Sequence, residues 1–185
     1  MNKINIGLLV GSARKNSFSK KVAETICSYL PDSYEVKFVD IGQLELYNQD
    51  YDDDGNVPKS WEAFREEIKG MDGYLFVTPE YNRSVPPVLK NALDIASRPY
   101  GKNSWSGKPG AVISVSPGSL GAFGANHHLR QSLTFLNVYT MQQPEAYLSN
   151  IADAIDKDGN FSNEATLGFL KSIAEGYVDW VSKFQ

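Results

Sequence analysis

The sequence predicts an α/β fold, a doubly wound three-layer sandwich built around a five-stranded parallel sheet. Two patterns lead to this prediction. Short apolar runs alternate along the chain with longer segments whose apolar residues recur every three or four positions. Several runs, such as residues 73–78, are apolar almost throughout, which is typical of strands buried on both faces of a parallel sheet. The length of 185 residues, of which 42% are hydrophobic, suits a single domain over residues 1–185.

The individual elements follow in order from these patterns. Residues 4–10 form a β-rich run that ends at Gly11 and Ser12, and residues 17–30 place apolar side chains at helical spacing. A strand, a loop and a helix are therefore expected at the start. The same patterns predict strands at 35–40, 73–78, 110–116 and 138–141, and helices at 61–71, 87–97, 125–136 and 164–184. Right-handed crossovers between the strands should place helices on both faces of the sheet.

Composition argues against several kinds of partner. The formal net charge is -4 and no basic stripe is visible, which disfavours nucleic acid. No apolar stretch approaches the roughly 20 residues that span a bilayer, and we expect no signal peptide and no membrane partner. Cys27 is the single cysteine, so it has no partner for an internal disulfide; we expect a buried thiol and a cytoplasmic location.

Three loops that follow apolar strands carry the chemistry, and carboxyl ends of parallel strands meet at one edge of a sheet. The first loop, residues 11–19, places Ser12, Ser17, Ser19 and Arg14 where a helix begins. Free helix N–H groups, hydroxyls and a guanidinium together suit a terminal phosphate. The alternative is that Ser17 or Ser19 only caps the helix.

The second and third loops suit a flat ring. In residues 78–87 three prolines stiffen the chain, and Tyr81 and Asn82 offer an aromatic face and an amide. Glu80 should act through its backbone, because a carboxylate beside an electron-rich reduced ring is unfavourable. The alternative is a rigid loop with an ordinary surface tyrosine. The third loop, residues 116–124, is glycine-rich, which lets backbone approach a ring closely but is a weak signal alone.

Together the loops resemble the NADPH-dependent FMN reductase family of flavodoxin-like proteins, and within it the soluble quinone and chromate reductases and the azoreductases. The resemblance spans roughly residues 4 to 148. The motifs that carry it are Gly11-Ser12-x-Arg14-x-x-Ser17, Pro79-Glu80-Tyr81-Asn82-x-Ser84-x-Pro86, Leu89-Lys90-Asn91-Ala92-x-Asp94, Ser97-Arg98-Pro99, Ser116-Pro117-Gly118 and Leu129-Arg130-Gln131.

The resemblance implies a flavodoxin-like enzyme that binds FMN and uses NADPH or NADH as co-substrate. Hydride would pass to the flavin, and two electrons would then pass to quinones, azo dyes, free flavins or metal oxyanions such as chromate. The cofactor carries this chemistry, so no side chain need act as acid or base. The cofactor-binding residues that it implies are Ser12, Arg14, Ser17, Phe18 and Ser19 around the phosphate, Pro79, Glu80, Tyr81, Asn82 and Ser84 around the ring, and Ser116 and Gly118 from the third loop.

The resemblance further implies a flavin near a subunit interface in a homodimer, or in a tetramer. Ser19 stands where relatives commonly carry Asn. Gly124 and His127 stand where many relatives carry Arg and Tyr, while Glu145 is kept. The last three positions belong to an inter-subunit hydrogen-bond network in such relatives.

Other motifs are given structural interpretations. Residues 50–55 begin like a calcium loop, but the twelfth position is Trp61, so we expect a solvated acidic loop. His127 and His128 are adjacent and would point about 100° apart on a helix, so a shared metal is not expected. Ser116 precedes proline and forms no G-x-S-x-G elbow. The buried stripe expected on the last helix consists of Phe169, Ile173, Tyr177 and Trp180.

Two other functions fit parts of the pattern. A flavodoxin-like electron carrier would bind FMN but would need partner proteins and would not oxidise nicotinamide directly. A Rossmann-type dinucleotide-binding domain is disfavoured, because no G-x-G-x-x-G follows the first strand.

Overall fold

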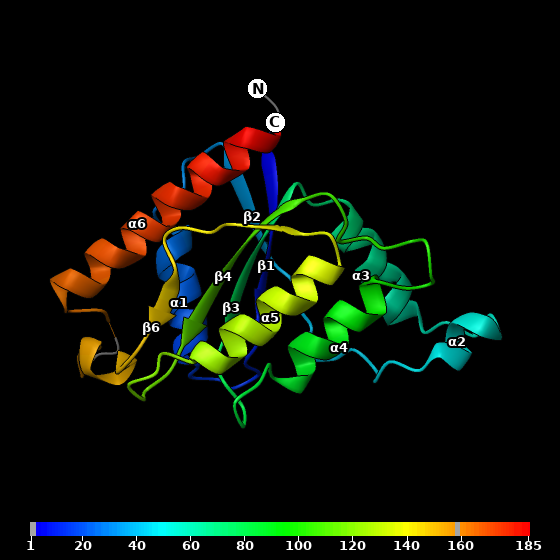
Figure 1. Cartoon of the computed structure of the whole chain (residues 1–185), viewed down its shortest axis with the longest axis horizontal. Helices are drawn as coiled ribbons and strands as arrows, with labels where there is room; N and C mark the ends of the chain where they lie inside the picture. The colour runs from blue at the N-terminus through cyan, green and yellow to red at the C-terminus, as the bar shows by residue number, and fades with distance from the viewer. Residues whose placement is uncertain (1–2, 158–159) are drawn as a thin grey trace.

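A parallel β-sheet runs through the centre of the computed structural model, which describes residues 3–157 and 160–185 (Figure 1). The strand order is β2-β1-β3-β4-β5, and β6 also pairs with β4. Every pair is parallel, so the doubly wound fold with five parallel strands is confirmed, with one strand more than expected. The strands are β1 Ile4–Val10, β2 Tyr34–Phe38, β3 Gly73–Thr78, β4 Pro109–Val115, β5 Tyr139–Thr140 and β6 Ala146–Leu148.

The additional strand β6 shares one edge of β4 with β5. Strand β5 pairs with Pro109 and Gly110 at the start of β4, whereas β6 pairs with residues 113–115 at its end. The segment between them contains Pro144, which has no N–H to donate to a ladder. With only three residues, β6 is too short to show a pattern in the sequence.

The helices cover both faces of the sheet (Figure 1). Helices α1 and α6 pack on one face, and α3, α4 and α5 pack on the other. The expected helices are confirmed with ends shifted by up to three residues. Among residues 3–157 and 160–185, no helix combines the length and apolarity needed to cross a membrane. The helices are α1 Phe18–Cys27, α2 Gln49–Asp53, α3 Lys59–Lys69, α4 Pro87–Ala96, α5 Phe123–Phe135 and α6 Glu164–Val181, with 3-10 turns at Ile151–Ala154 and Ser182–Phe184.

Alternation along the strands divides the core between the two faces. In β1, Ile6 and Leu8 pack beneath α1 and α6, whereas Leu9 packs beneath the opposite helices. The stripe expected on α6 is confirmed: Ile173 and Tyr177 are fully buried, while Phe169 and Trp180 are partly buried at its border. Burial of each large apolar side chain stabilises the fold by about 1.5–3 kcal/mol.

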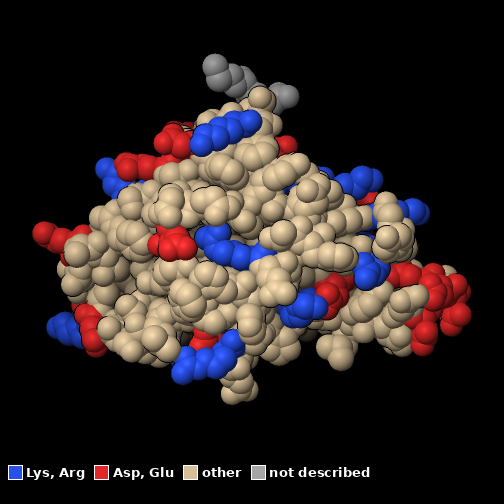
Figure 2. Space-filling view, viewed as in Figure 1, with Lys and Arg blue, Asp and Glu red and all other residues tan. Residues whose placement is uncertain are grey.

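The acidic stretch at residues 50–55 is not the loop that the sequence suggested, because most of it lies in α2. The Asn48 side chain caps this helix by accepting a hydrogen bond from Asp50 N at 3.1 Å. Asp52 forms a bidentate ion pair with Arg65 of α3, with both N–O distances 2.7 Å. The other acidic side chains are exposed and gather over α2 (Figure 2). The expected loop is therefore a short capped helix that is paired with α3 through Asp52.

Candidate functional site

The three loops of interest lie along one edge of the sheet, as predicted, because β1, β3 and β4 are parallel neighbours (Figure 1). The first two loops are in direct contact at Gly11. Its N–H donates to Val77 O at 2.8 Å. A Cβ at Gly11 would meet Thr78 Oγ1 at 3.1 Å and Pro79 Cδ at 3.3 Å. A larger residue there would require its neighbours in the second loop to move by a few tenths of an ångström.

The first loop ends in a capped helix. Ser17 Oγ accepts a hydrogen bond from Lys20 N at 3.3 Å, so Ser17 does cap α1. Its hydroxyl hydrogen can still donate to an anion, since the cap uses only the oxygen. Ser17 and Ser19 are buried, whereas Arg14 is exposed. The backbone N–H of Arg14 donates to Ser12 Oγ at 3.4 Å. The loop thus combines buried serine hydroxyls with an exposed cation.

Cavities flank the first loop on two sides. One, of about 310 Å³, lies between Ser12, Ala13 and residues 38–43. The other, of about 610 Å³, is lined by Phe18 and Ser17 and by a group of cations with one acid, Glu24. The positive side chains in the lining are Arg14, Lys15, Lys20, Lys21 and Lys157. A positive rim beside a helix N-terminus favours a phosphate.

The second loop is a tight hairpin. Tyr81 and Ser84 form an antiparallel bridge in which each N–H donates to the other residue's carbonyl oxygen at 3.0 Å. The two residues between them have positive φ, 50° at Asn82 and 67° at Arg83. Two-residue hairpins favour this conformation. The Tyr81 side chain is 44% exposed, so an aromatic face and an amide are presented on the rim.

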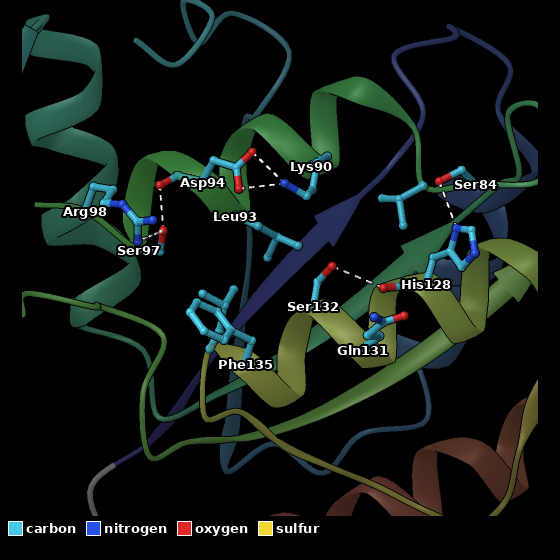
Figure 3. Close-up of a pocket in the computed structure, with 12 residues that line it drawn as sticks. Ser84, Lys90, Leu93, Asp94, Ser97, Arg98, His128, Gln131, Ser132 and Phe135 are labelled. Carbon is cyan, nitrogen blue, oxygen red and sulfur yellow. Dashed lines mark hydrogen bonds and ion pairs between the residues drawn. The ribbon is translucent and has the colours of Figure 1, made fainter. Parts of the chain in front are cut away.

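The hairpin is attached to α5 by two side chains. Glu80 Oε2 accepts a hydrogen bond from Ala125 N at 2.9 Å. Ser84 Oγ and His128 Nδ1 are 3.0 Å apart and share a hydrogen bond (Figure 3). The Glu80 carboxylate is therefore engaged with the protein, and its backbone remains for a ligand on the rim.

The third loop is connected to the segment that follows β6. Ser116 Oγ accepts from Gly118 N at 3.0 Å, Asn150 N donates to Gly118 O at 3.2 Å, and Ile151 N donates to Ser116 O at 3.2 Å. A Cβ at Gly118 would meet only Ser116 Oγ within 4 Å, at 3.5 Å. The backbone at Gly118 is thus open to a close approach. The supporting role of residues 150–151 had no signal in the sequence.

A buried polar network holds the third loop from beneath. Ser114 Oγ donates to Gly121 O at 2.7 Å, and Asn126 Nδ2 donates to Ser114 Oγ at 3.1 Å. Arg130 Nε donates to Asn126 Oδ1 at 2.9 Å. Ser114 and Asn126 are fully buried, and these hydrogen bonds give their polar groups partners within the protein. Neither residue could be singled out by sequence reasoning, because only the fold places them under the loop.

The two adjacent histidines point to different partners, as predicted. His127 Nε2 lies 3.0 Å from Tyr147 Oη, which donates to Glu145 Oε1 at 3.0 Å. Burial and the Glu145 carboxylate raise the pKa of Tyr147. His128 instead contacts Ser84. In the described part of the chain, no group of three or more His, Cys, Asp or Glu side chains is placed to hold a metal ion.

The residues on the rim suit FMN in their chemistry. The first loop supplies hydroxyl, guanidinium and helix N–H donors for a phosphate. The hairpin supplies a rigid aromatic and amide edge, and the open backbone at Gly118 admits a flat ring. The first two loops meet at Gly11, and Glu80 of the second loop accepts a hydrogen bond from Ala125 N, directly after the third loop.

Comparisons with known proteins agree with this geometry. The sequence model of the family described as NADPH-dependent FMN reductase matches residues 4–153. A quinone reductase of Pseudomonas putida is 50% identical over 177 residues, which are 96% of this chain and 94% of that one. A 2-hydroxy-1,4-benzoquinone reductase of Burkholderia sp is 46% identical over 178 residues, 96% of each chain. The solved structure of FerB, a flavoenzyme NAD(P)H:(acceptor) oxidoreductase from Paracoccus denitrificans, has a TM-score of 0.90 at 39% identity over 98% of each chain. All three loops lie within the matched residues.

Proposed function

The chain belongs to the NADPH-dependent FMN reductase family, and on that premise we propose that it reduces quinones with electrons from NADPH or NADH. As a family member it is a flavin oxidoreductase with FMN as cofactor and a nicotinamide co-substrate. When bound, FMN supplies the two-electron chemistry between nicotinamide and acceptor. One observation carries the proposal: the first loop, which suits an anion, and the aromatic hairpin at residues 81–84 lie at the same edge of the sheet.

We assign the contacts to FMN residue by residue. Arg14 neutralises the phosphate, and the serine hydroxyls and the N–H groups at the start of α1 donate to it. The hairpin lines the ring, and its exposed residues Tyr81, Asn82 and Arg83 shape the acceptor pocket. The assigned set is Ser12, Arg14, Ser17, Phe18 and Ser19 for the phosphate side, Pro79, Glu80, Tyr81, Asn82 and Ser84 for the ring, and Ser116 and Gly118 opposite them.

Quinones are the acceptors that we propose first, because two relatives that share about half of the sequence are named for quinone reduction. Azo dyes, free flavins and chromate are further proposed acceptors, since an exposed reduced ring can pass electrons to any small oxidant that reaches it. A pure electron carrier is disfavoured by the relatives, which are named as reductases.

We propose that a second copy of the chain covers the surface between α4 and α5. A cavity of about 640 Å³ lies there, with Leu93 and Leu136 in its lining and Phe135 79% exposed beside it (Figure 3). Lys90 and Asp94 form an ion pair at 2.8 Å on the same face, a self-complementary charge arrangement for a two-fold dimer, or for a tetramer built from it. Phe135→Asp should shift the mass measured by light scattering toward the monomer.

We also propose a cytoplasmic location, where the free Cys27 stays reduced.

One experiment tests the proposed reaction. The purified protein should bind FMN and should oxidise NADPH or NADH faster when 1,4-benzoquinone is added, as followed by nicotinamide absorbance. A protein that binds FMN without oxidising either nicotinamide is an electron carrier. A protein that binds no FMN when FMN is in excess contradicts both functions.

A further inference from the structure

The hairpin at residues 81–84 is held in a conformation that its own sequence does not favour. Asn82 tolerates positive φ, but Arg83 at φ 67° carries the steric cost that side chains with a Cβ meet in the left-handed region. Tyr81 and Ser84 close the turn with two hydrogen bonds, both at 3.0 Å. A strained exposed turn persists only where its surroundings hold it.

Helix α5 holds the hairpin at two places, through Ser84 on His128 and through Glu80 at the start of the helix. This helix begins after Ala122, which provides no side-chain cap, and has no acidic residue in its first turn. Phe123 N donates to Leu120 O at 3.1 Å, but no cap side chain or first-turn acid faces the positive dipole end of the helix. Glu80 supplies both a hydrogen-bond acceptor and a negative charge there, through Oε2 on Ala125 N at 2.9 Å. Its Oε1 lies 3.6 Å from Arg83 Nη1, and the side chain is only 14% exposed.

Gly124 allows the hairpin to come this close. A Cβ at this helical position would lie 2.8 Å from Arg83 O and 2.9 Å from Glu80 Oε2. Arg83 O is backbone and has no flexible end to move aside. Any larger residue at 124 must therefore push the hairpin away from α5.

We propose that Glu80 is a positioning residue that holds the flavin-facing hairpin against α5, and that Gly124 provides the space for this contact. The inference rests on the proposed function, in which the hairpin lines the FMN ring. Glu80 then acts through Tyr81 and Asn82, whose places on the rim depend on the contact.

Two variants open the contact by different routes. Glu80→Ala removes the acceptor and the charge. Gly124→Ala adds only a methyl group and a better helix former. In flavin-free protein, both should speed hydrogen exchange at the bridged amides of Tyr81 and Ser84 at least tenfold. Both should raise the Kd for FMN at least fivefold, measured by quenching of flavin fluorescence.

Matched controls separate a local effect from a general one. Gly168→Ala is the control for Gly124→Ala, because a Cβ at Gly168 in α6 meets nothing within 4 Å. Glu66→Ala removes an exposed carboxylate of α3 that pairs with Lys69 at 3.8 Å. Both controls should leave hairpin exchange and the Kd for FMN within twofold of wild type. Glu80→Gln keeps an oxygen acceptor for Ala125 N and should recover most of the lost affinity.

The outcomes distinguish this inference from the proposed function. If wild type binds FMN, and both opening variants bind it equally well with unchanged hairpin exchange, the positioning role is wrong. Faster exchange confined to the amides of α5 would also overturn it, because that result describes a helix cap alone. If wild type binds no FMN, the proposed function fails, while the exchange comparison still decides whether Glu80 holds the hairpin.

Discussion

Arg14 shows how one side chain can be assigned from its setting. It is exposed on the first loop beside the buried Ser17 and Ser19 hydroxyls. We expect Arg14→Ala to weaken FMN binding by about 1.5–3 kcal/mol, the scale of a charge-assisted hydrogen bond. Titration of FMN fluorescence measures this change. Lys171→Ala removes an equal charge from α6, where Lys171 pairs with Glu175, and should leave the affinity unchanged. Equal Kd values for Arg14→Ala and wild type would contradict the phosphate assignment.

The surroundings of Cys27 lower the reactivity of its thiol. Cys27 is partly buried, not fully buried as expected, and this burial, aided by the charge of Glu24, raises the pKa of its thiol to about 12. The thiol therefore stays protonated near neutral pH and is a poor nucleophile. Iodoacetamide at pH 8 should label the native protein far more slowly than the urea-unfolded protein. Similar rates in the two states would show that Cys27 is accessible and ionised in the fold.

The same burial predicts a loss of stability at alkaline pH. The pKa values of Cys27, Tyr74 and Tyr177 are all raised in the folded state, mainly by desolvation. The unfolded chain therefore releases these protons first, near pH 8.5 for Cys and about 10 for Tyr. The folded state then binds more protons, so the free energy of unfolding falls as pH rises above these values. Urea unfolding at pH 8 and 10 should show the fall, and Cys27→Ala should reduce it. A flat profile would contradict the shifts.

At the scale of elements, α2 is held to α3 by a buried ion pair and by an edge-on contact of the Tyr51 and Trp61 rings, whose centroids are 5.5 Å apart. Asp52 and Arg65 are only 5% and 12% exposed, and Arg65 Nε also donates to Ile95 O at 2.9 Å. Asp52→Asn should lower the free energy of unfolding by about 3 kcal/mol, because it leaves a largely buried guanidinium without its counter-charge. Asp53→Asn on the exposed side of α2 should change it by less than about 0.5 kcal/mol. Urea unfolding of the two variants measures the difference, and equal effects would contradict the structural role of the pair.

The secondary structure shows which elements follow from local pattern. Strands β1, β3 and β4 and the helices that follow them were predicted to within a few residues, because each is long enough to show an apolar run or a helical period. Helix α2 and strand β6 were missed. Each has five residues or fewer and depends on partners elsewhere, Arg65 for α2 and β4 for β6.

At the scale of the whole molecule, the candidate site exists only in the folded sheet, because its loops follow three different strands. A ligand that binds only the folded state stabilises it by about 2.7 kcal/mol at a free concentration one hundred times its Kd. FMN should therefore raise the melting temperature. Riboflavin, which lacks the phosphate, should raise it much less at the same concentration, since it forgoes the contacts of the first loop. Equal shifts with the two ligands would contradict the placement of the phosphate.

The sequence alone determined the fold class, the three loops and their common edge. Period, proline and glycine positions and short motifs are properties of neighbouring residues, and parallel strands bring their carboxyl ends together by geometry. The family motif in residues 79–86 was sufficient to suggest FMN, and the family match over residues 4–153 agrees.

Only the tertiary structure decided how these loops are held. Glu80 meets Ala125 across 45 positions of sequence, Ser84 meets His128 across 44, and Arg65 meets Asp52 across 13. Such pairs leave no local pattern, because their energies depend on distance and burial in space and not on separation along the chain. The space at Gly124 is likewise visible only once α5 and the hairpin are packed together.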